Sequence, residues 1–106
     1  MTIWIKEGVH GRLEPPIRRF KGHVAEAYQR LGYDLQITSK CDGNHCAGSC
    51  HYEGNAIDFK RQHVQMEIIR TVANGVAELY GYKPEDFDIV EYDDERDIFH
   101  VEFDKK

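Results

Sequence analysis

The chain has 106 residues, of which 41% are hydrophobic and 31% are charged, and its formal net charge is -5 at pH 7. This length predicts a single domain, residues 1–106, that can bury a core of its own. The acidic balance excludes a nucleic-acid partner, because contact with phosphates needs a basic surface. A membrane partner is also excluded, since no stretch approaches the roughly 20 apolar residues of a span. Charges interrupt the first ten residues, so no secretory signal is visible, and we expect a cytoplasmic monomer.

The first predicted element is a helix over residues 15–31. Pro15 and Pro16 suit its first turn, apolar side chains then recur at steps of three and four, and Gly32 ends it. No strand is predicted before this helix. After it, apolar and polar side chains alternate over residues 35–38, which predicts a short, half-buried strand.

A glycine-rich loop is predicted over residues 39–55, followed by a short strand over residues 56–59 and a second helix over residues 64–80. Gly81 ends this helix, and Pro84 prevents it from resuming. Its expected buried stripe consists of Ile68 or Ile69, Val72, Val76, Leu79 and Tyr80.

The last part of the chain predicts a β-hairpin. Phe87, Ile89 and Glu91 would face one way in its first strand, residues 92–97 form a charged tip, and residues 98–103 form its second strand. The order of elements predicts an α+β domain in which a small antiparallel sheet packs with two helices.

The three cysteines, Cys41, Cys46 and Cys50, lie within ten residues of each other. An odd count in one short loop is not typical of a secreted disulfide framework. Three interpretations stay open: inert thiols with or without a local disulfide, a second metal site with His45, and a cysteine nucleophile in which Cys50 pairs with His100.

His51, Asp58 and His100 are candidate metal ligands. Two imidazoles and one carboxylate form the ligand set of a catalytic zinc site that keeps one position open. Asp58 lies in a predicted strand, where aspartate is depleted, so its presence suggests a functional role. Such a ligand set also accepts cobalt or manganese, so the identity of the metal stays open.

Residues 49–58, Ser-Cys-His-Tyr-Glu-Gly-Asn-Ala-Ile-Asp, resemble the S-x-H-x-x-G-x-A-x-D signature of a zinc peptidase family. That family includes D-alanyl-D-alanine carboxypeptidases, D-Ala-D-Ala dipeptidases and phage L-alanyl-D-glutamate endolysins, and the hedgehog signalling domain shares its fold. The third zinc ligand of the family is a histidine on a late strand, which the Phe-His-Val-Glu of residues 99–102 resembles. The resemblance implies a hedgehog-like fold and Zn2+ held by His51, Asp58 and His100. It also implies an enzyme that hydrolyses peptide bonds in peptidoglycan stem peptides.

The resemblance also suggests catalytic and substrate-binding residues. In many relatives the general base is a glutamate three residues before the last ligand, and here that position holds Asp97, whose side chain is one methylene shorter. Glu91 matches a recurrent glutamate on the preceding strand and is the second candidate. His45, in a stretch similar to the D-G-x-H of small phage and bacterial members, and Ser49 are the candidate substrate-binding residues.

The chain also departs from the family pattern, because no arginine lies between residues 31 and 60. Many members carry one there, and it pairs with a peptide carboxylate. This departure and Asp97 favour an alternative function, a zinc-bearing binding or structural module of the same fold with weak or no catalysis. For an enzyme, the resemblance leaves open which bond is cleaved, and whether the protein acts in the cytoplasm or at the cell wall after release during phage lysis.

Overall fold

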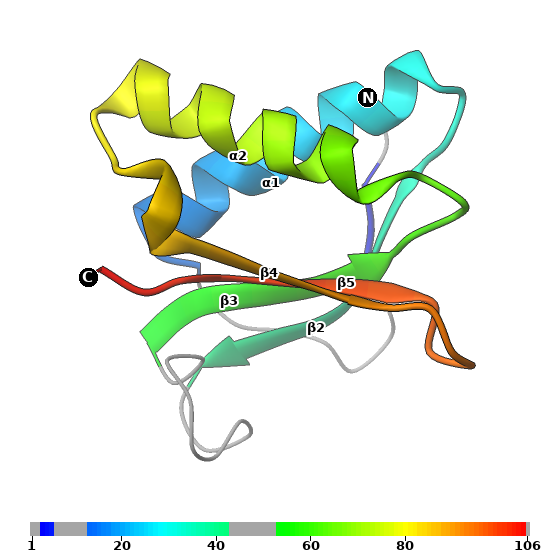
Figure 1. Ribbon diagram of the computed structural model, residues 1–106. Coiled ribbons are helices and arrows are strands. Elements are labelled where there is room, and N and C mark those ends of the chain that lie inside the picture. The colour runs from blue at the N-terminus through cyan, green and yellow to red at the C-terminus, as the bar shows by residue number, and fades with distance from the viewer. Residues whose placement is uncertain (1–2, 6–12, 43–52, 106) are drawn as a thin grey trace.

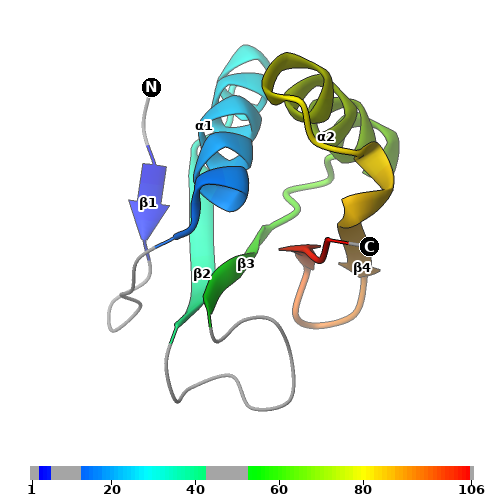
Figure 2. The same ribbon diagram turned by 90° about the vertical axis from the view of Figure 1, so that its left-hand side faces the viewer.

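The computed structural model describes residues 3–5, 13–42 and 53–105, and it has the small α+β fold predicted from the sequence (Figures 1 and 2). The α-helices are α1 (Pro15–Arg30) and α2 (Met66–Tyr80), and a short 3-10 helix, η3 (Pro84–Asp86), precedes β4. The strands are β1 (Ile3–Ile5), β2 (Leu35–Asp42), β3 (Glu53–Lys60), β4 (Phe87–Tyr92) and β5 (Ile98–Phe103). Both helices cover the same face of the sheet, so the described part of the chain forms two layers.

The strands of the sheet lie in the order β1-β2-β3-β5-β4. Strands β2, β3, β5 and β4 pair antiparallel, as expected. The prediction of no strand before the first helix was wrong, because Ile3–Ile5 pair with β2 in parallel at the sheet edge. Three residues are too few to show strand periodicity. Their pairing depends on contact with the core, against which Ile3 packs.

Both helices begin and end where the sequence predicts, to within two residues. Pro residues occupy the first turn of α1, and Gly32 follows its end with φ at 86°. Gly81 ends α2 in the left-handed conformation with φ at 78°, and its N–H donates to the carbonyl of Ala77. Glycine adopts this conformation without the steric cost that a side chain brings, so both glycines suit helix ends.

The buried stripe of α2 differs from the prediction at its end. Leu79 and Tyr80 are 67% and 41% exposed, whereas Ile69, Ala73 and Val76 are fully buried. The Tyr80 ring packs outside the core on α1, where the Arg19 guanidinium carbon lies 4.3 Å from the ring centroid. Helical periodicity identifies the apolar face of a helix. Only the tertiary structure shows which residues at the end of that face stay exposed outside the core.

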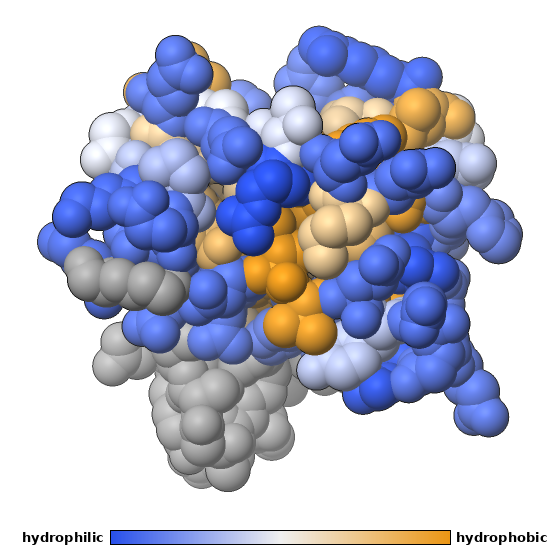
Figure 3. Space-filling model, in the orientation of Figure 1, coloured by the Kyte–Doolittle hydropathy of each residue, from blue (hydrophilic) through white to orange (hydrophobic). Residues whose placement is uncertain are grey.

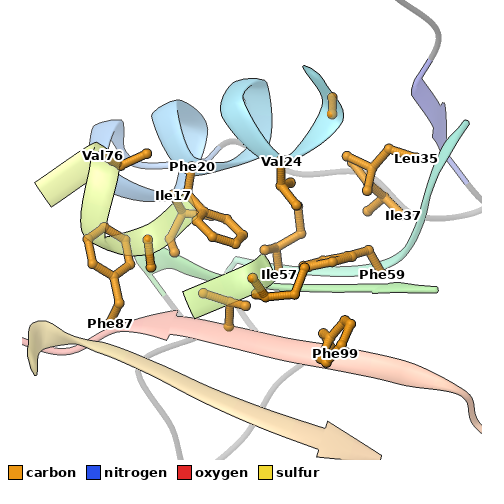
Figure 4. Close-up of a cluster of buried hydrophobic side chains, with 14 of the residues drawn as sticks. Ile17, Phe20, Val24, Leu35, Ile37, Ile57, Phe59, Val76, Phe87 and Phe99 are labelled. Carbon is orange, nitrogen blue, oxygen red and sulfur yellow. The ribbon is translucent and has the colours of Figure 1, made fainter. Parts of the chain in front are cut away.

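The core lies between the helices and the sheet and is rich in aromatic rings (Figure 4). Phe59, near the end of β3, has the ring centroids of Phe20, Tyr28 and Phe99 at 5.8 to 6.1 Å. These distances lie within the range of favourable aromatic pairs.

Among the described residues, no helix is long and apolar enough to cross a membrane.

Tyr28 joins the core to the end of β3. Its side chain is fully buried, and its hydroxyl donates to the carbonyl oxygens of Lys60 and Arg61 at 2.9 and 3.2 Å. Burial, with the nearby negative charge of Asp97, raises the pKa of Tyr28 well above the ordinary tyrosine value. The phenol therefore stays neutral under conditions in which an exposed tyrosine ionises.

Replacing Tyr28 with phenylalanine is expected to destabilise the protein by about 1–3 kcal/mol, because two carbonyl groups lose their donor. Denaturant unfolding monitored by circular dichroism measures this cost. An unfolded tyrosine ionises near pH 10, so the neutral phenol stabilises the wild type fully below about pH 10, and this stabilisation is lost as the pH rises. In an ultraviolet absorbance titration, Tyr28→Phe should remove the tyrosine ionisation that occurs at the highest pH. Loss of an earlier ionisation instead would contradict the burial of the hydroxyl.

Candidate metal centre

Strands β3 and β5 bring together two of the three predicted metal ligands. Asp58 on β3 and His100 on β5 are direct partners in the antiparallel register, although they lie 42 residues apart in the chain. Their side chains are in contact, with Nδ1 of His100 2.6 Å from Oδ1 of Asp58. An imidazole nitrogen and a carboxylate oxygen in contact are two of the donors that zinc prefers.

The pair lies on the face of the sheet opposite the helices. Successive side chains of a strand point to opposite faces. The neighbours of the two residues on their strands are fully buried in the core under the helices: Ile57, Phe59, Phe99 and Val101. Asp58 and His100 therefore point to the other face, where their side chains are 18% and 14% exposed. Partial burial strengthens electrostatic interactions at the pair relative to bulk water.

Glu102 also belongs to this site, and it is not among the predicted site residues. It lies two residues after His100 on β5 and therefore shares its face. One of its carboxylate oxygens, Oε1, is 2.8 Å from Nε2 of His100. Each ring nitrogen of His100 thus faces a carboxylate, Asp58 on one side and Glu102 on the other. The period of two in the predicted strand is the signal that identifies Glu102.

The two carboxylates dominate the electrostatics of the imidazole. Burial of the His100 ring, the largest single influence, lowers its pKa, but the hydrogen bonds and charges of Asp58 and Glu102 together outweigh burial and raise the pKa above the ordinary histidine value. The site therefore favours a positive charge at its centre. A metal ion that binds the ring has to displace a proton from it.

A wider acidic surface begins at Glu102. Asp88 on β4 is its partner in the register of the hairpin. Carboxylate oxygens of Asp88, Glu102 and Asp104 lie within 4.8 Å of one another. Such groups of acidic side chains are common without a metal ion. They add negative charge next to the Asp58–His100 pair, and by themselves they are only weak evidence for a metal site.

Asp97, the first candidate for the general base, lies directly before β5 with φ at 49°. Its carboxylate Oδ1 accepts a hydrogen bond of 3.0 Å from Nε of Arg61, and its backbone carbonyl accepts one from the Arg61 N–H. Its side chain is 40% exposed. In the described residues, Asp97 therefore pairs with Arg61 and not with the Asp58–His100 pair.

Glu91, the second candidate, lies on the other face of the sheet. In the hairpin register Glu91 is the partner of Phe99, which is buried under the helices, whereas Val90 is the partner of His100. The Glu91 carboxylate also forms an ion pair with Arg61. The sheet therefore separates Glu91 from the Asp58–His100 pair, and this position does not suit a base acting there.

Arg61 joins both candidate bases at one end of the sheet. The sequence has no arginine over residues 31–60, and Arg61 follows directly after β3. It borders a groove of about 810 Å³ between the start of α2 and β4, lined also by Met66, Arg70 and Ile89. Figure 3 shows a narrow apolar strip within a mostly hydrophilic surface on this side of the molecule. The groove and the Asp58–His100 pair lie on different faces of the sheet.

Three other predicted site residues and two of the cysteines cannot be placed. His45, Ser49 and His51 lie outside the described residues, as do Cys46 and Cys50. Cys41 is described through its backbone, at the end of β2. In the interpretation of a cysteine nucleophile, His100 would act through Nε2, the ring nitrogen that faces away from Asp58. That nitrogen is already hydrogen-bonded to Glu102.

Comparison with protein-family models gives no match for the chain, and comparison with curated proteins gives none either. The family resemblance therefore depends on the motifs of residues 49–58 and 99–102.

Proposed function

We propose that the protein is a zinc-dependent peptidase that hydrolyses peptide bonds in peptidoglycan stem peptides. The contact between Asp58 and His100 is the observation that supports this proposal most strongly. The signature assigns both residues as ligands from motifs 42 residues apart, and the two side chains are 2.6 Å apart on one face of the sheet. A metal site requires such convergence, whereas two unrelated surface residues would show it only by coincidence.

The donors fit a catalytic zinc site. Asp58 and His100 would hold the ion, with His51 as the third ligand according to the signature, and a fourth position would stay open for water. When bound, zinc supplies a Lewis acid that activates water and polarises the carbonyl group of the substrate. The strand register keeps Asp58 and His100 together without a metal, so little ordering is needed when the ion binds.

Asp97 is the proposed general base. It lies three residues before His100, at the position of the base in many members of the family, and we prefer it to Glu91, which the hairpin register puts on the opposite face from His100. Arg61 holds one oxygen of the Asp97 carboxylate through Nε. This ion pair restricts the rotation of a side chain that must stay aligned to accept a proton from water.

The test of this function is the metal content and activity of the purified protein. We expect one zinc ion per chain, and cleavage of purified muropeptides that stops when a chelator removes the ion and returns when zinc is restored. His51→Ala should bind zinc more weakly and lose the cleavage. Iodoacetamide, which alkylates thiols, should leave the cleavage unchanged. Full hydrolysis by the His51→Ala variant, or by metal-free wild type, would overturn the proposal.

A second candidate function is a zinc-bearing binding module, and the ion pairs of Arg61 favour it. Both candidate bases, Asp97 and Glu91, pair with this one guanidinium, and no contact joins either of them to the Asp58–His100 pair in the described residues. A binding module would hold zinc with the same stoichiometry but would show no chelator-sensitive cleavage of muropeptides. The same two measurements therefore separate the two functions.

A further inference from the structure

We infer that Glu102 is a positioning residue of the metal site: it holds the His100 ring so that Nδ1 faces Asp58. The inference rests on the proposed zinc function, and it assigns a role to a side chain that the ligand signature does not include. It depends on one contact, between Oε1 of Glu102 and Nε2 of His100 at 2.8 Å. The side chain of Glu102 is 21% exposed, so solvent competes only partly for this bond.

The hydrogen bond sets which ring nitrogen is free to bind a metal. A neutral imidazole carries one N–H, and its other nitrogen has the lone pair that a metal needs. In the metal-free protein Nδ1 donates the hydrogen bond of 2.6 Å to Asp58, because a carboxylate only accepts. When Glu102 keeps the proton of Nε2, Nδ1 is the nitrogen that gives up its proton and offers its lone pair to a metal. In metal sites, outer carboxylates commonly fix the tautomer and orientation of histidine ligands in this way.

The same bond also prevents the ring from turning over. A rotation of about 180° around the last side-chain torsion would exchange ring nitrogens for ring carbons on both sides. His100 would then lose its contacts with Asp58 and Glu102 together. Because Glu102 and His100 lie two residues apart on one strand, the backbone of β5 fixes their spacing. Asp58 comes from the neighbouring strand, so the ring is held from two independent elements.

Glu102 and Asp58 therefore have different roles, although both are carboxylates beside the same imidazole. Asp58 belongs to the ten-residue signature and faces the nitrogen proposed to bind zinc. Glu102 faces the nitrogen that carries the proton, and a protonated nitrogen has no lone pair to donate. We therefore place Glu102 next to the ligand set and outside it.

The experiment compares Glu102→Ala and Glu102→Gln with the wild type. Asp88→Asn is the matched control, because it removes one negative charge from the adjacent acidic surface while both hydrogen bonds of His100 stay. Zinc affinity is measured by competition with a chelating dye. The protonation of each ring nitrogen is read from nitrogen-15 NMR of metal-free and zinc-loaded protein, with His100→Ala to assign the signals. Circular dichroism verifies that each variant is folded.

We expect Glu102→Ala to bind zinc 10 to 100 times more weakly, the usual effect of losing such a partner, and to lose the protected Nε2 proton signal. Glu102→Gln should recover most of the affinity, since its amide oxygen still accepts the bond. Asp88→Asn should behave like the wild type. A general effect of charge would instead weaken Asp88→Asn and Glu102→Gln together, and this result would overturn the inference.

Two further results would also overturn it. In the first, Glu102→Ala keeps the zinc affinity and the Nε2 signal of the wild type, and Glu102 then has no role in the zinc site. Zinc on Nε2 in the loaded protein would make Glu102 a ligand. If the wild type itself binds no zinc, the proposed function fails together with the inference, and that failure is distinguishable because it occurs without any substitution.

Discussion

Replacing His100 with alanine is expected to abolish zinc binding and chelator-sensitive hydrolysis of muropeptides. The loss should exceed the 10- to 100-fold effect of removing an outer partner such as Glu102, because the substitution removes a proposed ligand itself. It also leaves the carboxylates of Asp58 and Glu102, both partly buried, without the imidazole between them. Zinc content after dialysis and the rate of cleavage of purified muropeptides measure the two losses.

His23→Ala is the matched control for this prediction. His23 lies on α1, in the helix layer on the other side of the sheet, and its ring contacts Tyr80 in an exposed position. Substitutions at such surface positions usually change stability by no more than about 0.5 kcal/mol. The control should therefore keep the zinc content and activity of the wild type. Stoichiometric zinc and normal cleavage in His100→Ala would refute the ligand assignment.

The second large effect concerns the core, where Phe59→Ala is expected to cost about 3–5 kcal/mol of unfolding free energy. Phe59 is fully buried and packs against the rings of Phe20, Tyr28 and Phe99. Removing the ring loses these contacts and leaves a cavity that stiff aromatic neighbours fill poorly. Small domains have only about 5–15 kcal/mol of stability in total, so the variant should be close to unfolding.

Denaturant unfolding measures this cost, with Val90→Ala as the control. Val90 is 41% exposed on β4, so shortening its side chain should change the unfolding free energy by about 0.5 kcal/mol or less. Phe59 also follows Asp58 directly on β3, and zinc affinity should fall together with stability in Phe59→Ala. A cost below about 1 kcal/mol for Phe59→Ala would contradict the packing of the core.

The sequence alone determined the elements whose signals are local. Proline in the first turn of α1, the glycines after both helices and the three- and four-residue spacing of apolar side chains predict the helices almost to their ends. Alternation predicts the hairpin, and it correctly puts Glu91 on the face of Phe87 and Ile89. These features depend on the backbone preferences and burial of residues close together in the chain, so a short window contains them.

The tertiary structure decided which of these residues meet. The register between β3 and β5 places Asp58 beside His100. The register between β4 and β5 places Glu91 on the opposite face of the sheet from that pair. Arg61 pairs with Asp97 and Glu91 only because the end of β3, the end of β4 and the start of β5 lie at the same place. Strand β1 likewise exists through its contact with β2. Strand pairing joins residues that are distant in the chain, and one step of register exchanges the faces of a whole strand. Local periodicity therefore identifies the candidates for the site, and the pairing of the strands selects among them.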